Sequence, residues 1–60
     1  MLTFEVYKDV KGEFRWRLKA VNQRVIADSG EGYRNKADCT AAIALFKSGV
    51  AGARIVDLAV

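Results

Sequence analysis

The first half of the chain alternates between apolar and polar residues, which is the pattern of strands with one buried face. Residues 2–8 place Leu2, Phe4 and Val6 on one side. Residues 13–20 repeat the pattern more clearly, with an apolar set formed by Phe14, Trp16, Leu18 and Ala20. The opposite side of both segments is polar and carries Thr3, Glu5, Tyr7, Glu13, Arg15, Arg17 and Lys19. The pattern predicts two strands that share one apolar face.

The stretch Val10-Lys11-Gly12 separates these strands and favours a three-residue hairpin loop. Such a loop needs a positive φ at its last position, which glycine adopts without steric cost. Pairing Asp9 with Glu13 sets Phe4 opposite Leu18, so that both apolar faces agree. A loop of two or four residues would shift the register by one residue and set an apolar side chain against a charged one.

A second hairpin is predicted around Asn22-Gln23, with a two-residue type I′ turn. This turn pairs Ala20 with Val25, Leu18 with Ala27 and Arg17 with Asp28. Apolar residues again fall on one side, apart from Ile26, which falls on the polar face. Arg17 is then expected between Glu5 and Asp28 in a row of complementary charges, whereas Arg15 and Lys19 have no carboxylate on both sides.

A helix followed by a last strand completes the predicted unit. Ser29-Gly30-Glu31-Gly32-Tyr33 reads as a loop and Asn35 as the N-cap of a helix. A buried helical face is indicated by the i, i+3, i+4, i+7 spacing of Cys39, Ala42, Ile43 and Phe46. Gly49 is the expected end of the helix, and residues 53–58 are expected to form a strand.

Length and composition then limit what this α+β unit can be. The chain has 60 residues, which is one domain over residues 1–60, with a net charge of +3, one cysteine and no histidine. A domain this small buries a modest share of its surface and gains from a staple or a partner subunit. One cysteine excludes an internal disulfide and the composition disfavours zinc, so we expect a homodimer, no metal and no cofactor. No apolar stretch is long enough to span a membrane and no export signal is evident, so we expect a cytoplasmic protein.

Several segments together resemble the YegP-like family of small uncharacterised prokaryotic proteins. They are Phe4-Glu5-Val6-Tyr7-Lys8-Asp9, Gly12, Arg15-Trp16-Arg17-Leu18-Lys19-Ala20, and Ile26 to Tyr33 with Lys36. The resemblance implies a β-β-β-α-β unit, two copies of which form one continuous antiparallel sheet, with one helix on one face of each unit and exchanged C-terminal strands. It implies no established activity. Members of the family often have Asn-Gly where this chain has Asn22-Gln23.

The candidate binding residues are Tyr7, Arg15 and Lys19 on the polar sheet face, and Tyr33 beside the glycine loop. Arginine matches phosphate and an aromatic ring stacks on bases, so this row could serve a nucleic acid, but nearby carboxylates weaken its field. Cys39 lies on the apolar helix stripe with no histidine to activate it, so we expect no catalytic residue.

Two functions therefore follow from the sequence. The first is a non-catalytic binding or protein-interaction module. The alternative is a weak nucleic-acid or polyanion binder that uses the basic sheet face. We do not expect an enzyme.

Overall fold

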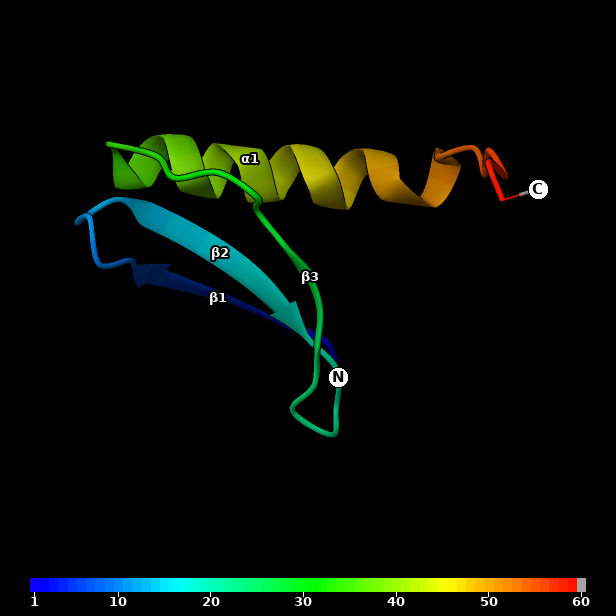
Figure 1. Ribbon diagram of the computed structural model, residues 1–60, viewed down its shortest axis with the longest axis horizontal. Coiled ribbons are helices and arrows are strands. Elements are labelled where there is room, and N and C mark those ends of the chain that lie inside the picture. The colour runs from blue at the N-terminus through cyan, green and yellow to red at the C-terminus, as the bar shows by residue number, and fades with distance from the viewer. Residues whose placement is uncertain (60) are drawn as a thin grey trace.

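The computed structural model describes residues 1–59, which form a three-stranded sheet crossed on one face by a helix (Figure 1). The elements are β1 (Thr3–Lys8), β2 (Phe14–Lys19), β3 (Val25–Asp28), α1 (Lys36–Gly49) and a short 3-10 helix, η1 (Val50–Gly52). The sheet is antiparallel with the order β1-β2-β3. The predicted α+β architecture is confirmed for these four main elements.

The first hairpin has the predicted register. Phe4 lies opposite Leu18 and Val6 opposite Trp16. The Asp9 N–H donates to the Glu13 carbonyl (2.9 Å), which closes a three-residue loop. Gly12 ends this loop with a φ of 81°, as predicted from the need for positive φ at that position.

The prediction of a two-residue type I′ turn in the second hairpin is wrong. The Ala20 N–H donates to the Arg24 carbonyl (2.8 Å) and the Gln23 N–H donates to the Ala20 carbonyl (3.0 Å), so the loop is Val21-Asn22-Gln23. Gln23, with a φ of 72°, is the only non-glycine residue of positive φ in the described chain. A type I′ turn requires positive φ at two positions, whereas this loop requires it at one. The conformational cost is therefore lower in a loop that contains no glycine.

The longer loop shifts the pairing of β2 with β3 by one residue, and a bulge restores the predicted register. Leu18 still pairs with Ala27 and Arg17 with Asp28, as predicted, but Val25 pairs with Lys19 and not with Ala20. The register shifts between Leu18 and Lys19. The extra residue in the bulge is Ile26, which is why it did not fit the alternation of the strand.

The core lies between α1 and the inner face of the sheet, where the predicted apolar sides meet. Trp16, Leu18 and Cys39 are buried, and Trp16 is only 6% exposed. Its ring meets those of Phe4 and Phe46 edge to face, with centroids 5.5 and 5.2 Å away. These edge-to-face contacts are the preferred geometry of aromatic pairs, and they join β1, β2 and α1 into one cluster.

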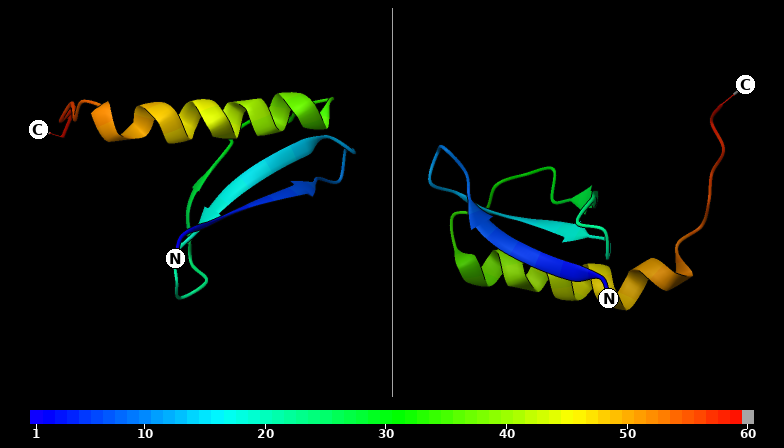
Figure 2. Two further views of the ribbon diagram at one scale, coloured as in Figure 1. Left: turned by 180° about the vertical axis from the view of Figure 1, so that it is seen from behind. Right: turned by 90° about the horizontal axis from the view of Figure 1, so that it is seen from below.

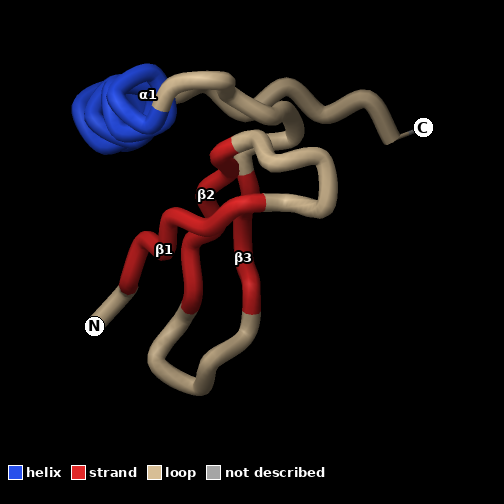
Figure 3. Tube along the Cα trace, turned by 90° about the vertical axis from the view of Figure 1, so that its left-hand side faces the viewer, coloured by secondary structure: helices blue, strands red, loops and turns tan. Residues whose placement is uncertain are grey.

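The helix covers only part of the sheet. It begins after Asn35, as predicted, although the Asn35 side chain bonds the Asp38 carboxylate and makes no hydrogen bond to the helix backbone. Its contacts are with β2 and β1 and not with β3 (Figure 3). The loop before it returns to the sheet, where Tyr33 forms an isolated bridge with Phe14.

The C-terminal segment, residues 53–59, does not form the predicted strand within this chain. After η1 it extends away from the sheet and helix without pairing with either (Figure 2). Its large apolar side chains are exposed, with Ile55 at 97% and Leu58 at 84%. A strand needs a neighbour to pair with its backbone, and in a single copy this segment has none.

Candidate binding surfaces

Two surfaces of the molecule are candidates for a binding site. One is the polar side of the sheet, opposite α1, which we call the open sheet face. Its strand residues are Thr3, Glu5, Tyr7, Arg15, Arg17, Lys19 and Asp28. The other is an apolar hollow between the edge strand β1 and the end of α1.

Ion pairs cover most of the open sheet face. The Arg17 Nε–H donates to Glu5 Oε1 (2.7 Å), and the same oxygen lies 3.5 Å from Lys19 Nζ. The Arg15 Nε–H donates to Asp9 Oδ2 (2.7 Å). Arg15 and Lys19 thus each lie beside one carboxylate and, as predicted, neither has a carboxylate on both sides. Alternation alone gave no indication that Asp9, at the hairpin corner, reaches back to Arg15.

Arg17 was predicted to lie between two carboxylates, but it is paired with only one of them. Asp28 lies opposite it in the register, but the Asp28 carboxylate accepts the Gly30 N–H (3.1 Å) and forms no ion pair within residues 1–59. The other side of the guanidinium lies over the ring of Tyr7, 4.5 Å from its centroid. Arg17 is thus held by Glu5 and Tyr7 of β1.

These contacts shift the acid–base equilibria of the face. The hydrogen bond from Arg17 holds the pKa of Glu5 below its ordinary value, and the hydrogen bond from Arg15 does the same for the pKa of Asp9. Two backbone N–H groups, those of Lys11 and Glu13, also donate to Asp9. The face is therefore a set of fixed ion pairs at neutral pH, and its positive field is weak.

Tyr33 does not join the other candidate residues. It pairs with Phe14, whose side chain belongs to the core, and Tyr33 packs against the same core. Cross-strand partners project to the same side of a sheet, so Tyr33 lies on the helix side, away from Tyr7, Arg15 and Lys19. Neighbouring Glu31 raises the pKa of its hydroxyl.

Cys39 has the surroundings of a structural residue. It is fully buried, and burial raises the pKa of its thiol, so the thiolate that would act as a nucleophile is disfavoured. Within residues 1–59 no cluster of three metal-ligating side chains is present. No helix in the same part of the chain is long and apolar enough to cross a membrane.

The apolar hollow was not predicted from the sequence. It has a volume of about 240 Å³ and is lined by Leu2, Phe4, Leu18, Phe46, Lys47 and Val50. We call it the β1–α1 hollow. Its residues come from both ends of the chain and meet only because the end of α1 lies over the beginning of β1. The one sequence signal was Leu2, assigned to the apolar side of its strand but 56% exposed in the structure.

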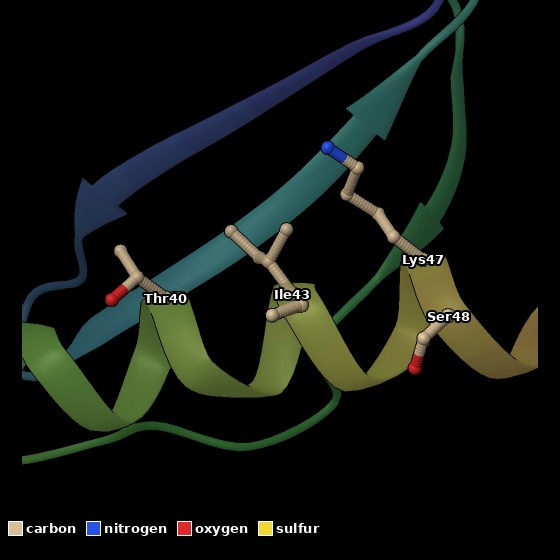
Figure 4. Close-up of a pocket in the computed structure, with 5 residues that line it drawn as sticks. Thr40, Ile43, Lys47 and Ser48 are labelled. Atoms are coloured by element: carbon tan, nitrogen blue, oxygen red, sulfur yellow. The ribbon is translucent and has the colours of Figure 1, made fainter.

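A shallower depression of about 440 Å³ continues along α1 (Figure 4). Ile43 and Lys47 extend from the helix toward the strands, and Ser48 points away from them (Figure 4). The hydroxyls of Thr40 and Ser48 already donate to the helix carbonyls of Ala37 and Leu45 (3.0 and 3.1 Å). Lys47 is therefore the main polar group that this side of the helix offers to a partner.

Comparison with known proteins places the chain among proteins of the same fold. Residues 9–57 match a domain of unknown function, DUF1508. A UPF0339 protein of Neisseria meningitidis serogroup B is 51% identical over 55 residues, which cover 92% of this chain and 96% of the relative. The chain belongs to this family of small uncharacterised proteins, which confirms the YegP-like resemblance.

Solved structures agree with the fold. The solution NMR structure of a protein from Haloferax volcanii superimposes with a TM-score of 0.88 at 36% identity and covers 93% of each chain. The solution NMR structure of protein ATU0232 from Agrobacterium tumefaciens has a TM-score of 0.75 at 42% identity, over 97% of this chain and 92% of that one. The similarities extend over the whole unit but indicate no activity.

Proposed function

We propose that the protein is a small non-catalytic interaction module that works as a homodimer, in which the C-terminal segment of each copy covers the β1–α1 hollow of the other. The observation that carries this proposal is the pairing of an exposed apolar segment with an uncovered apolar hollow. Within a single copy the segment extends away from the sheet and helix and does not cover the hollow (Figure 2). A second copy brings both together twice, once on each side of a two-fold axis.

Physical considerations support this arrangement. Fully burying a Val, Leu or Ile side chain stabilises by about 1.5–3 kcal/mol, and the segment exposes Ile55, Val56 and Leu58. The outer edge of β1 is open, because β1 is the terminal strand of the β1-β2-β3 sheet. An added strand there would use its unpaired backbone groups and continue the sheet. The segment would then be the fourth strand of the unit, contributed by the partner.

The polyanion alternative has less support. Each cation of the open sheet face lies beside a carboxylate, so little uncompensated charge is left to release counterions from a nucleic acid. The other cations of the chain lie elsewhere, at the hairpins, in and just before the helix, and in the C-terminal segment: Lys8, Lys11, Arg24, Arg34, Lys36, Lys47 and Arg54. We therefore favour a protein partner over a nucleic acid.

Light scattering of the intact chain tests the proposal. We expect a mass of twice 6.6 kDa at micromolar concentration. Ile55→Asp should give a folded monomer, because Ile55 is exposed in one copy and would be buried in the dimer. Val10→Asp is the matched control, since Val10 is an equally exposed apolar residue at the far hairpin, and it should remain dimeric.

Two results would contradict the dimer. One is a stable folded monomer of the unaltered chain under these conditions. The other is an Ile55→Asp variant that associates as strongly as the Val10→Asp control.

A further inference from the structure

The β1–α1 hollow and the C-terminal segment each carry a charge that suits the other. Five of the six residues that line the hollow are apolar, and the sixth is Lys47. Lys47 also lines the depression that continues along α1, so it lies where the two meet. The one acidic residue of the segment, residues 53–59, is Asp57. The hollow therefore presents one cation, and the segment that covers it in the dimer brings one carboxylate.

Both charges are available to a second copy. Lys47 and Asp57 are exposed and form no ion pair within residues 1–59. The Lys47 side chain extends from α1 toward the strands (Figure 4). The Asp57 carboxylate accepts the N–H of Ala59 (2.9 Å), two residues further along the same segment. An ion pair between the two residues would thus replace no existing one.

The segment is long enough to follow β1 from end to end. A strand rises about 3.3 Å per residue, so residues 53–59 reach about 23 Å and the six residues of β1 about 20 Å. Ile55 and Asp57 are two residues apart and project to the same side of an extended strand, roughly 6.5–7 Å from each other. With Ile55 in the hollow, the next residue that faces inward is Asp57, one step along the groove that Lys47 borders.

Both sides of the segment carry large apolar residues, so burial excludes neither facing, and charge distinguishes them. Asp57 shares one side with Ile55, and Arg54 is on the other. If the side of Ile55 faces the hollow, Asp57 lies toward Lys47, and Arg54 lies toward the open sheet face, where β1 carries Glu5. The reverse facing sets Arg54 on the side of Lys47 and Asp57 on the side of Glu5. Like charges on neighbouring strands destabilise a sheet, so the first facing is favoured.

We propose that Lys47 and Asp57 form an ion pair between the two copies, and that this pair selects a second copy of the chain as the occupant of the hollow. Lys47 of each copy receives Asp57 of the other, so the dimer contains the pair twice. This inference rests on the proposed dimer and names the residues that determine its specificity. An exposed ion pair adds little affinity, but a like-charge contact in its place opposes binding, and charged groups select partners in this way.

Charge reversal at either residue tests the pair on the intact chain. Lys47→Glu and Asp57→Lys each replace both ion pairs of a homodimer with like-charge contacts. Each should raise the dissociation constant of the dimer about tenfold, as measured by analytical ultracentrifugation. Lys11→Glu, at an exposed lysine of the first hairpin, is the matched control for Lys47→Glu and should dimerise as the unaltered chain does. Circular dichroism checks that each variant is folded.

Mixing the two variants distinguishes a pair between copies from a general effect of charge. A heterodimer of Lys47→Glu and Asp57→Lys contains one unaltered pair and one reversed pair, and both are attractive. We expect it to form about as tightly as the unaltered homodimer, with native mass spectrometry identifying the heterodimer. A mixture of Lys11→Glu and Asp57→Lys has the same net charges, but its heterodimer retains one like-charge contact. In that mixture Asp57→Lys should stay largely monomeric.

Two results would overturn the pair. One is a Lys47→Glu variant that dimerises as tightly as Lys11→Glu. The other is a mixture of Lys47→Glu and Asp57→Lys that forms no heterodimer although each variant alone is weakened. A folded monomer of the unaltered chain would overturn the proposed dimer and this pair together, whereas a dimer that is indifferent to charge reversal would overturn the pair alone.

Discussion

The second hairpin loop has a residue with a side chain where the first has glycine, and this allows a direct measurement of its conformational cost. Both loops contain three residues and close with the same pair of backbone hydrogen bonds. Their last residues, Gly12 and Gln23, have φ values of 81° and 72°. The Gln23 side chain is exposed and donates no hydrogen bond within the described residues. Changing Gln23 to glycine therefore alters the backbone preference and little else.

The expected effect is a modest gain in stability. A residue with a Cβ pays about 1–2 kcal/mol for the left-handed conformation, and Gln23→Gly removes this cost. The greater freedom of glycine in the unfolded chain offsets about 0.4–1 kcal/mol of the gain. We therefore expect Gln23→Gly to raise the free energy of unfolding by about 0.5–1 kcal/mol. In a chain of this size the melting temperature should rise by roughly 3–6 °C.

The mirror substitution in the first hairpin serves as the control. A Cβ added at Gly12 meets no atom within 4 Å, so Gly12→Gln tests the φ preference without a clash. It should lower stability by about as much as Gln23→Gly raises it, and the double variant should resemble the unaltered chain. Chemical denaturation at one protein concentration measures all four, because self-association would make the midpoint concentration-dependent. A Gln23→Gly midpoint equal to or below that of the unaltered chain would refute the reasoning.

Two further predictions concern the core and the ion pairs. Trp16→Ala should cost roughly 3–5 kcal/mol and nearly unfold the domain, as followed by circular dichroism; a melting temperature within a few degrees of the unaltered chain would contradict its central place in the core. Arg17 and Arg15 hold the pKa values of Glu5 and Asp9 below their ordinary values of 4.5 and 3.8. The stability that these carboxylates contribute is therefore complete at a pH above the ordinary pKa values. It is lost as the pH falls through the lower pKa values of the folded state. Denaturation midpoints should thus fall as the pH drops below about 4.5, and Glu5→Gln should flatten that dependence; an unchanged pH profile would mean that the Glu5 ion pair does not stabilise the fold.

The sequence by itself determined the three strands of the sheet, the first hairpin, the helix and the core face. Each of these depends on periodicity or on one local conformational requirement, such as the positive φ at Gly12. The spacing of Cys39, Ala42, Ile43 and Phe46 likewise placed the buried side of α1 correctly. The apolar alternation even fixed the register of β1 against β2, because a slip of one residue would set charges against the core.

Only the tertiary structure decided the second turn, the partners of the cations and the β1–α1 hollow. The loop at Val21–Gln23 and the bulge at Ile26 compensate each other across two strands, and strand alternation alone does not resolve such a pair of changes. Asp9 reaches Arg15 because the loop turns its carboxylate back over the strand. The hollow exists because the end of α1 rests over the start of β1, which brings Leu2 and Val50 together from opposite ends of the chain. Local patterns record which side of an element is apolar, whereas contacts between distant elements depend on how those elements pack.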